Sequence, residues 1–316
     1  MKLLLRLVYS VAAVVVILVA ALALASVGAY YYVKPSMPAV ATLRDVRLQV
    51  PLRVYTRDGR LLAEYGEERR IPLTWEEIPE QMTQAFLAAE DDRFFEHPGV
   101  DYQGLLRAAI SMIRTGGERR QGGGTITMQL ARNFFLTREK TISRKTREIF
   151  LALRIERQLT KQEILTLYLN KIFLGQRAYG IGAAAEVYFG KPVSKLTLAE
   201  TATIAGLPKA PSLDNPVRDP DRATQRRAYV LRRMLETSFI DESAYQAALA
   251  APMVSHLHSA TLEAHAPYVG EMIRREMLNR YGGDADTAGF SVVTTVDSRL
   301  QAAAVGALRT ALLEYD

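Results

Sequence analysis

The distribution of apolar and polar positions changes character several times along the chain. Residues 7–29 contain no charged side chain, and these 23 residues correspond to roughly 34 Å of helix, enough to cross a bilayer core. Lys2 and Arg6 precede this stretch, and three tyrosines follow it. Because basic residues stay in the cytoplasm, we predict that residues 1–33 form a cytoplasmic tail and a single transmembrane helix. A cleaved signal peptide is the alternative, and both interpretations export the rest of the chain.

Residues 34–70 predict a juxtamembrane linker followed by a short β-hairpin. Residues 53–56 and 61–65 are two runs with strand-forming side chains, and they flank Asp58-Gly59. An Asp-Gly pair between two such runs is a strong signal for a tight hairpin turn.

Residues 79–250 have the periodicity of helices, and we predict one large, mainly α domain over residues 71–250. A helix over 79–90 begins at a proline, and Asp101 is placed to cap a helix over 102–114. Residues 105–114 have a broad apolar face, which fits either core packing or contact with a membrane surface. Further helix starts are expected at Thr160 with Glu163, at Thr197 with Glu200 and at Asp219, and helix ends at Gly175 and Gly190.

After residue 251 the pattern loosens. Residues 290–296 predict a strand, and a helix is expected from Leu300 to the end of the sequence.

Composition narrows the class of protein without choosing one. The chain has 316 residues and a net charge of +6. It contains no cysteine, so a disulfide framework and a thiolate metal site are excluded. A basic, arginine-rich surface suits phospholipid headgroups, nucleic acid or pyrophosphate, although a general preference for arginine over lysine explains the composition equally well.

The first candidate for chemistry is the acidic segment that begins at Glu90. Glu90 is expected at the C-terminal end of an apolar helix, where the helix dipole disfavours a negative charge. Phe94 or Phe95 could partly desolvate it, which would suit general acid or base work. The alternative is a solvated acidic turn, and His97 fits a structural histidine better than a metal ligand.

Two further candidates follow along the chain. Arg144, Lys145 and Glu148 are three and four residues apart, so they project from one face of a helix expected over 141–158. They form either a surface salt-bridge ladder or a site for an anionic leaving group beside a carboxylate. Residues 115–124 predict a mobile, glycine-rich loop, and the glycines that precede Thr125 leave backbone N–H groups open to an anion.

Several short motifs with defined residue spacing follow one another along the chain. They are Glu90-Asp91-x-x-Phe94-x-x-His97-x-Gly99, Gly122-x-x-Thr125-x-x-x-Gln129, Arg144-Lys145-x-x-Glu148, Lys161-x-x-Ile164-Leu165-x-x-Tyr168-Leu169-Asn170 and Ala205-Gly206-Leu207-Pro208-x-Ala210-Pro211. Together they resemble the motifs of the family 51 peptidoglycan glycosyltransferases, in the arrangement of the N-terminal portion of class A penicillin-binding proteins. The family usually has serine at the position of Gly124 and glutamine at that of Met128.

The resemblance also implies a division into domains. Residues 71–250 would be the glycosyltransferase domain, and residues 251–316 would be a linker and a lead-in to a transpeptidase domain absent from this chain. The nucleophile of that domain lies in Ser-x-x-Lys, and no serine here is followed three residues later by lysine. Either the sequence is a piece of a longer protein or the protein lacks the second activity.

The fold implied by the resemblance is a lysozyme-like helical lobe with a membrane-facing lobe, preceded by the transmembrane helix and the hairpin. The implied reaction joins lipid II units into β-1,4-linked glycan strands by inverting single displacement and releases polyprenyl pyrophosphate. Glu90 would be the catalytic base, and Glu148, the second catalytic carboxylate, would position the basic cluster or the donor sugar. Substrate contacts are implied for Asp91, Arg93, Phe94, His97, Gly122, Thr125, Gln129, Arg132, Arg144, Lys145 and Asn170.

The implied partners are lipid II, the growing glycan strand, membrane lipid and other cell-wall synthesis proteins, but no nucleic acid. The protein would lie in the inner membrane with its catalytic domain on the periplasmic or extracellular side. No cofactor is required by the resemblance, and assistance by a divalent cation, Mg²⁺ or Mn²⁺, stays open. A peptidoglycan hydrolase and a non-enzymatic anchored scaffold are the rival interpretations.

Overall fold

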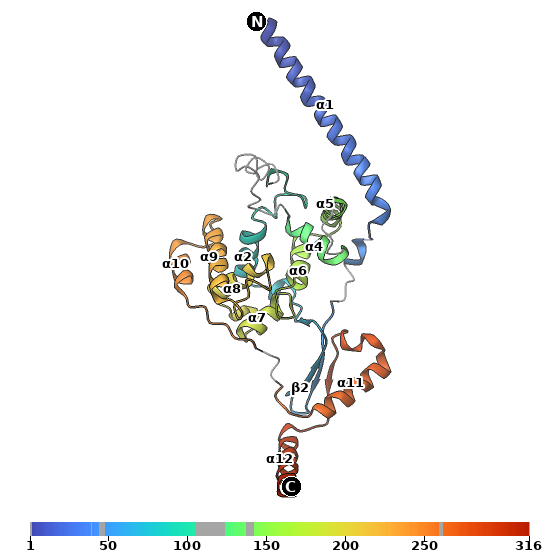
Figure 1. Ribbon diagram of the computed structural model, residues 1–316, viewed down its shortest axis with the longest axis vertical. Helices are drawn as coiled ribbons and strands as arrows, with labels where there is room; N and C mark the ends of the chain where they lie inside the picture. Colours follow the sequence, from blue (N-terminus) through green and yellow to red (C-terminus); the bar gives the residue numbers. More distant parts are fainter. Residues whose placement is uncertain are drawn as a thin grey trace. The chain divides into compact units, whose positions relative to one another are not determined.

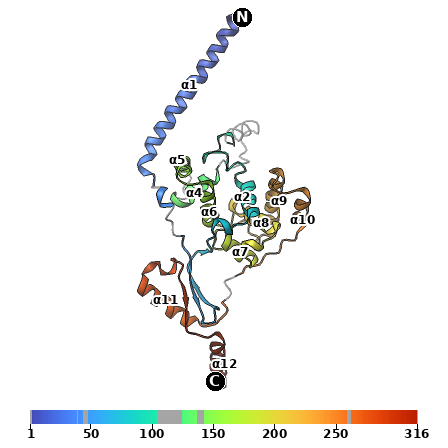
Figure 2. The ribbon, with the colours of Figure 1, turned by 180° about the vertical axis from the view of Figure 1, so that it is seen from behind.

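The computed structural model describes residues 2–38, 40–43, 48–104, 124–136, 142–258 and 262–315 (Figures 1 and 2). The chain divides into two compact units, of which the first combines Met1–Arg44 with His97–Thr160 and the second combines Asp45–Glu96 with Lys161–Asp316. Each unit is described by itself.

The first unit is helical. Its elements are α1 (Lys2–Val33), η1 (Lys34–Ser36), η2 (Val40–Leu43), α4 (Ile126–Phe135) and α5 (Ile142–Gln158). The α4 and α5 helices pack together, and Val100, Met128 and Ala152 form a small buried cluster between them. The last turns of α1 contact α5. The rings of Tyr30 and Phe150 pack edge-on there, with their centres 5.3 Å apart.

Within the described part of the chain, no helix combines the length and apolarity that crossing a membrane requires.

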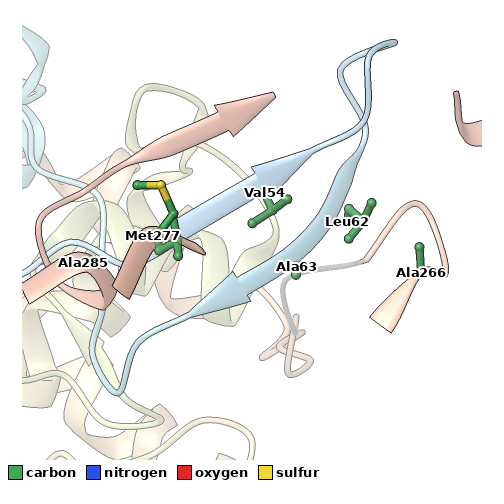
Figure 3. Packing of buried hydrophobic residues seen from close by; sticks show 7 residues of the cluster. Val54, Leu62, Ala63, Ala266, Met277 and Ala285 are labelled. Atoms are coloured by element: carbon green, nitrogen blue, oxygen red, sulfur yellow. The ribbon is translucent and has the colours of Figure 1, made fainter. Parts of the chain in front are cut away.

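The second unit contains a three-stranded sheet with one helix along it (Figure 1). The strands are β1 (Leu52–Tyr55), β2 (Leu61–Tyr65) and β5 (Ser291–Val293), in the order β2-β1-β5. The β1 strand pairs antiparallel with β2 and parallel with β5. Buried side chains from the sheet, from α11 (Pro267–Tyr281) and from η6 (Gly283–Asp286) form its apolar core, including Val54, Leu62 and Met277 (Figure 3).

The same unit contains a group of packed helices. The α8 helix contacts both α2 and α9, and α9 also contacts α2, so these three helices lie side by side in Figures 1 and 2. The helices of this unit, apart from α11, are α2 (Glu80–Glu90), α6 (Lys161–Lys171), α7 (Ile181–Phe189), α8 (Leu198–Gly206), α9 (Pro220–Glu236), α10 (Glu242–Ala250) and α12 (Ser298–Tyr315). The short elements are β3 (Arg69–Arg70), which pairs parallel with β4 (Ala178–Tyr179), and η3 (Trp75–Glu77), η4 (Val193–Lys195) and η5 (Leu207–Lys209).

Most helix boundaries agree with the sequence-based expectations. Thr197 and Glu200 form the expected capping box, Asp219 caps α9, and Gly190 ends α7 in the left-handed conformation with φ 63°. Asp101 caps residues 102–104, whereas residues 105–123, which cover most of the expected helix and loop, lie outside the described residues. The mainly helical fold and the hairpin are confirmed.

Some expectations were wrong in detail. The α6 helix ends at Lys171, and Gly175 lies in the turn after it, where its carbonyl accepts a hydrogen bond from the Ala178 N–H. Its φ of 88° explains why glycine occupies the position, but it does not end the helix. The α11 helix, the strands β3 and β4 and the parallel pairing of β5 were not predicted.

Candidate functional site

Glu90 is the last residue of α2, as the sequence predicts, and its side chain is 14% exposed. The charged group beside it comes from α9, where Nη2 of Arg226 lies 3.6 Å from Oε1 of Glu90. This separation is an ion pair rather than a hydrogen bond, and the low exposure limits its screening by solvent. The carboxylate is therefore largely buried beside a cation, which does not fit a solvated acidic turn.

Arg226 is held in place by two further contacts. Its Nε atom donates a hydrogen bond to the Gly206 carbonyl at 3.0 Å, and its guanidinium lies 4.4 Å from the ring centre of Tyr229. A Cβ atom on Gly206 would stand 2.8 Å from Cγ of Arg226, so a side chain there would displace the arginine. Gly206 thus allows the arginine stem to pass close to the end of α8.

A second arginine of α9 holds the same end of α2. Arg233 donates from Nε to the Ala88 carbonyl at 3.3 Å and from Nη2 to Asp92 at 2.8 Å. Burial alone would lower the pKa of Arg233, but its hydrogen bonds to Glu236 and Asp92 outweigh burial and raise that pKa. A permanent cation at a helix C-terminus satisfies carbonyls that have no partner within the helix, so Arg233 fixes the helix end that carries Glu90.

The residues after Glu90 anchor the segment in the core. Asp91 is 8% exposed, and Phe94 is fully buried with the ammonium of Lys161 4.4 Å from its ring centre. Phe95 is 55% exposed. Phe94 therefore packs as a core residue, whereas Arg226 contributes a charged group next to the Glu90 carboxylate.

Asn170 has a structural role in the same unit. Its side-chain oxygen accepts a hydrogen bond from the Leu73 N–H at 2.8 Å, and its amide nitrogen donates to the carbonyls of Leu73 and Thr166. The amide thus joins α6 to the extended segment before α2. Its assignment to substrate binding stays a prediction.

In the first unit, the end of the first motif is joined to the start of α4. The Thr125 hydroxyl donates to the Gly99 carbonyl at 2.6 Å and accepts from the Met128 N–H at 3.1 Å, which caps the helix. Nδ1 of His97 accepts a hydrogen bond from the Gly99 N–H at 3.2 Å, which fits the structural interpretation of this histidine.

Gly99 is required by its surroundings. Its φ is 91°, and a Cβ atom would lie 2.8 Å from Cγ of Glu156 and 3.0 Å from the carbonyl oxygen of Ala152. Any side chain would therefore separate the motif from α5.

Glu148 lies on α5, where its side chain is 1% exposed. It accepts a hydrogen bond from Nη1 of Arg144, and Nζ of Lys145 lies 3.3 Å away. The three residues share one helix face, as their spacing predicts, but a buried carboxylate does not fit a simple surface ladder. Lys145 is 44% exposed, so its ammonium remains accessible to a ligand while Glu148 holds its position.

The two departures from the family motif have separate explanations. A Cβ atom on Gly124 would lie 3.8 Å from Nζ of Lys145, which is ordinary contact, so the usual serine would fit there. Met128 is 2% exposed and packs in the cluster with Val100 and Ala152, so the usual glutamine is replaced by an apolar core residue.

The remaining predicted contacts are partly described. Gln129 is 8% exposed, and Arg132 is half-buried on α4. As far as the chain is described, no ion pair involves Arg132, so its guanidinium is open to an anion. Gly122 lies outside the described residues, and Arg93 is half-buried after α2.

The two predicted carboxylates belong to different units: Glu90 lies in the second and Glu148 in the first. Sequence reasoning missed Arg226, Arg233 and Gly206 as the groups around Glu90. The two arginines lie seven residues apart on α9, and this helical spacing was the available signal. Among the described residues, no group of three or more His, Asp or Glu side chains is arranged to hold a metal ion.

Comparison with known proteins identifies the class. A family model described as "Transglycosylase" matches residues 58–235, which is more than half of the chain, and the chain belongs to this family. The match covers Glu90, Glu148 and Arg226, and it confirms the resemblance to peptidoglycan glycosyltransferases that the motifs carry.

Within this family, the chain is similar to penicillin-binding proteins 1A of several bacteria. The chain is 55% identical over 92% of its length to penicillin-binding protein 1A of Pseudomonas aeruginosa, and 53% identical over 92% of its length to that of Escherichia coli. It spans about a third of these relatives, 35% and 34% of their lengths. It also resembles the crystal structure of penicillin-binding protein 1A from Haemophilus influenzae, with 38% identity and a TM-score of 0.50 over 86% of this chain and 30% of that one.

Proposed function

We propose that this chain polymerises lipid II into β-1,4-linked glycan strands and releases polyprenyl pyrophosphate. Membership of the transglycosylase family and the likeness to penicillin-binding protein 1A support the reaction class. The observation that carries the mechanism is the largely buried Glu90 carboxylate at the end of α2, with Arg226 3.6 Å away.

Glu90 acts as the base that takes the proton from the acceptor 4-hydroxyl. A base must be ionised before it accepts a proton, and the nearby guanidinium of Arg226 stabilises that charged form. The acceptor oxygen then displaces pyrophosphate with inversion, as in an inverting glycosidase in which a sugar hydroxyl replaces water.

Arg144 and Lys145 stabilise the departing pyrophosphate, and Glu148 keeps them in position. Pyrophosphate is a good leaving group, so it needs charge stabilisation more than protonation. Glu148 is buried between the two cations, which supports a positioning role for this carboxylate. A divalent cation, Mg²⁺ or Mn²⁺, would assist the same charge stabilisation.

The remaining substrate contacts belong to the same proposal. They are Asp91, Arg93, Phe94, His97, Gly122, Thr125, Gln129, Arg132 and Asn170. Of these, the half-buried Arg132 offers a positive charge with no described ion-pair partner, which suits a phosphate group.

We also propose that residues 7–29 anchor the protein in the inner membrane, with the catalytic domain outside the cytoplasm. The proposal rests on the uncharged sequence and on exposed apolar side chains along α1, which suit contact with lipid. Val14, Val16, Ile17, Leu24 and Val27 are each more than half exposed. The lysozyme-like and membrane-facing lobes, and the boundaries of the domain at residues 71–250 and of the linker at residues 251–316, are further parts of this proposal.

Incubation of the full chain with lipid II tests the proposed function. We expect glycan polymer to accumulate, and replacement of Glu90 by glutamine to lower the initial rate by about 100-fold or more, because the amide keeps the shape but accepts no proton. Glu96→Gln is the matched control, because Glu96 lies nearby but is exposed. Release of fragments from finished sacculi without growth on lipid II would favour the hydrolase, and a fully active Glu90→Gln protein would exclude Glu90 as the base.

A further inference from the structure

A cavity of about 410 Å³ lies between the end of α1 and one face of α5. It is lined by Tyr30, Phe150, Leu153, Arg154, Arg157 and Gln158. The five lining residues of α5 follow the spacing i, i+3, i+4, i+7 and i+8, so they form a single stripe along the helix. The volume is within the usual range of roughly 300–1,000 Å³ for small-molecule sites.

The cavity is apolar at one end and positively charged at the other. Tyr30, Phe150 and Leu153 supply the apolar wall, whereas Arg154 and Arg157 supply two guanidinium groups one helical turn apart. No acidic residue is among the lining residues. Within the described chain, neither arginine takes part in an ion pair, so both charges are open to an anion.

The position of the cavity along the chain indicates where its ligand comes from. Tyr30 follows directly after the uncharged stretch at residues 7–29, which is the level of the headgroups if that stretch spans the membrane. Lys34 lies one turn further, with its ammonium 6.0 Å from the centre of the Tyr30 ring. A phosphate at Arg154 and Arg157 would thus lie in the headgroup region, with its hydrocarbon chain along the aromatic wall.

We propose that this cavity binds one anionic phospholipid of the surrounding membrane. The two arginines hold the phosphate, and Tyr30, Phe150 and Leu153 contact the first part of an acyl chain. The inference rests on the proposed membrane anchoring. It implies that a lipid molecule lies between α1 and α5 and contacts both helices. It concerns neither Glu90 nor the leaving group.

Binding of short-chain lipids to the full chain in neutral detergent, followed by native mass spectrometry, tests the proposal. Dioctanoyl phosphatidylglycerol should bind in one-to-one stoichiometry and more tightly than dioctanoyl phosphatidylcholine. Each basic residue near an anionic headgroup strengthens binding by about fivefold, so the Arg154→Gln/Arg157→Gln variant should lose about 25-fold in affinity. The Arg154→Lys/Arg157→Lys variant keeps both charges and should lose far less.

The matched control is Arg299→Gln/Arg309→Gln, which removes the same charge from exposed positions of α12. It should keep the wild-type affinity for phosphatidylglycerol. Equal binding of phosphatidylcholine, displacement of the lipid by inorganic phosphate, or an equal loss in the control would each overturn the proposal. Flotation of the wild-type chain with vesicles and polymerisation of lipid II in detergent test the anchor and the enzyme separately.

Discussion

Arg226 is the residue at which three stretches of the second unit meet. It lies beside Glu90 of α2, donates to the last residue of α8 and stacks on Tyr229 of its own helix. The hydrogen bond and the ring fix the guanidinium, so it offers Glu90 a cation in a defined place. We therefore regard Arg226 as a positioning residue for the base.

Replacing Arg226 by glutamine should lower kcat for lipid II by about 10- to 100-fold, with little change in KM. The loss follows because Arg226 keeps Glu90 ionised and in place before proton transfer, and the variant loses both effects. Arg226→Lys should recover part of the rate, since it keeps the charge but not the fixed planar group. Initial rates of lipid II polymerisation by the wild type and by both Arg226 variants test this prediction. Arg232→Gln on the exposed face of α9 is the control, and an equal loss there would exclude a specific role.

Lys145 is the partner of Glu148 that remains accessible, and Lys145→Met should affect turnover more than stability. Glu148 keeps its hydrogen bond from Arg144, so the helix should persist. We expect kcat to fall by about 10- to 1,000-fold because a cation beside the leaving group is lost. Thermal unfolding should shift only slightly, as for Lys195→Met at an exposed position. Unchanged turnover would move the leaving-group role to other arginines.

At the scale of elements, the start of α8 is a capping box reinforced by a third residue. Thr197 accepts a hydrogen bond from the Glu200 N–H, and Glu200 accepts one from the Thr197 N–H. Lys191 donates to both carboxylate oxygens of Glu200, at 2.7 and 2.9 Å. The other end of the same helix is Gly206, which receives Arg226, so the cap stabilises an element that holds the candidate site.

Glu200→Gln should lower the thermal midpoint at pH 7 by about 2–4 °C, as expected for the loss of a charged cap worth about 1 kcal/mol. Burial alone would raise the pKa of Glu200, but hydrogen bonds from Lys191 and Thr197 outweigh it and hold the pKa below its ordinary 4.5. The stabilisation is therefore complete above pH 4.5 and is lost as the pH falls through the folded-state pKa.

Thermal melts of both proteins from pH 7 to pH 3 measure this effect, and their midpoints should converge at the acid end. Glu186→Gln, at an exposed position of α7, should show no such convergence. A constant difference between Glu200→Gln and wild type across the whole range would contradict the linkage.

The elements differ in how far sequence alone could predict them. The hairpin at Asp58-Gly59 and the capping box at Thr197 are local signals, because the residues that cause them are neighbours in the chain. Glu90 was found by the same kind of reasoning, from its place at a helix end. Arg226 was missed because its contact with Glu90 depends on the packing of α9 against α2, which no local pattern encodes.

At the scale of the whole molecule, the least predictable feature is the sheet. Arg53, Val54 and Tyr55 of β1 pair with Ser291, Val292 and Val293 of β5, so the sheet joins early and late parts of the sequence. The loop between these strands is long, and closing it costs conformational entropy that no local signal in the sequence offsets. A short run such as residues 290–296 predicts a strand but does not identify its partner.

The apolar core of the sheet should behave as a separate folding unit. Its buried members come from β1, β2, α11, η6 and the segment before α11, and none comes from α2, α8 or α9. Leu62 is 1% exposed, so Leu62→Ala should lower the free energy of opening the sheet by about 3 kcal/mol. Native-state hydrogen exchange should then show amides of β1 and β5 exchanging about 100-fold faster, while those of α8 and α9 keep their protection. Leu300→Ala, at a side chain that is 70% exposed, should change neither group. If the amides of α8 accelerate together with those of β1, the sheet and the helices of the candidate site open as one cooperative unit, and the stability of the sheet would then bear directly on the geometry around Glu90.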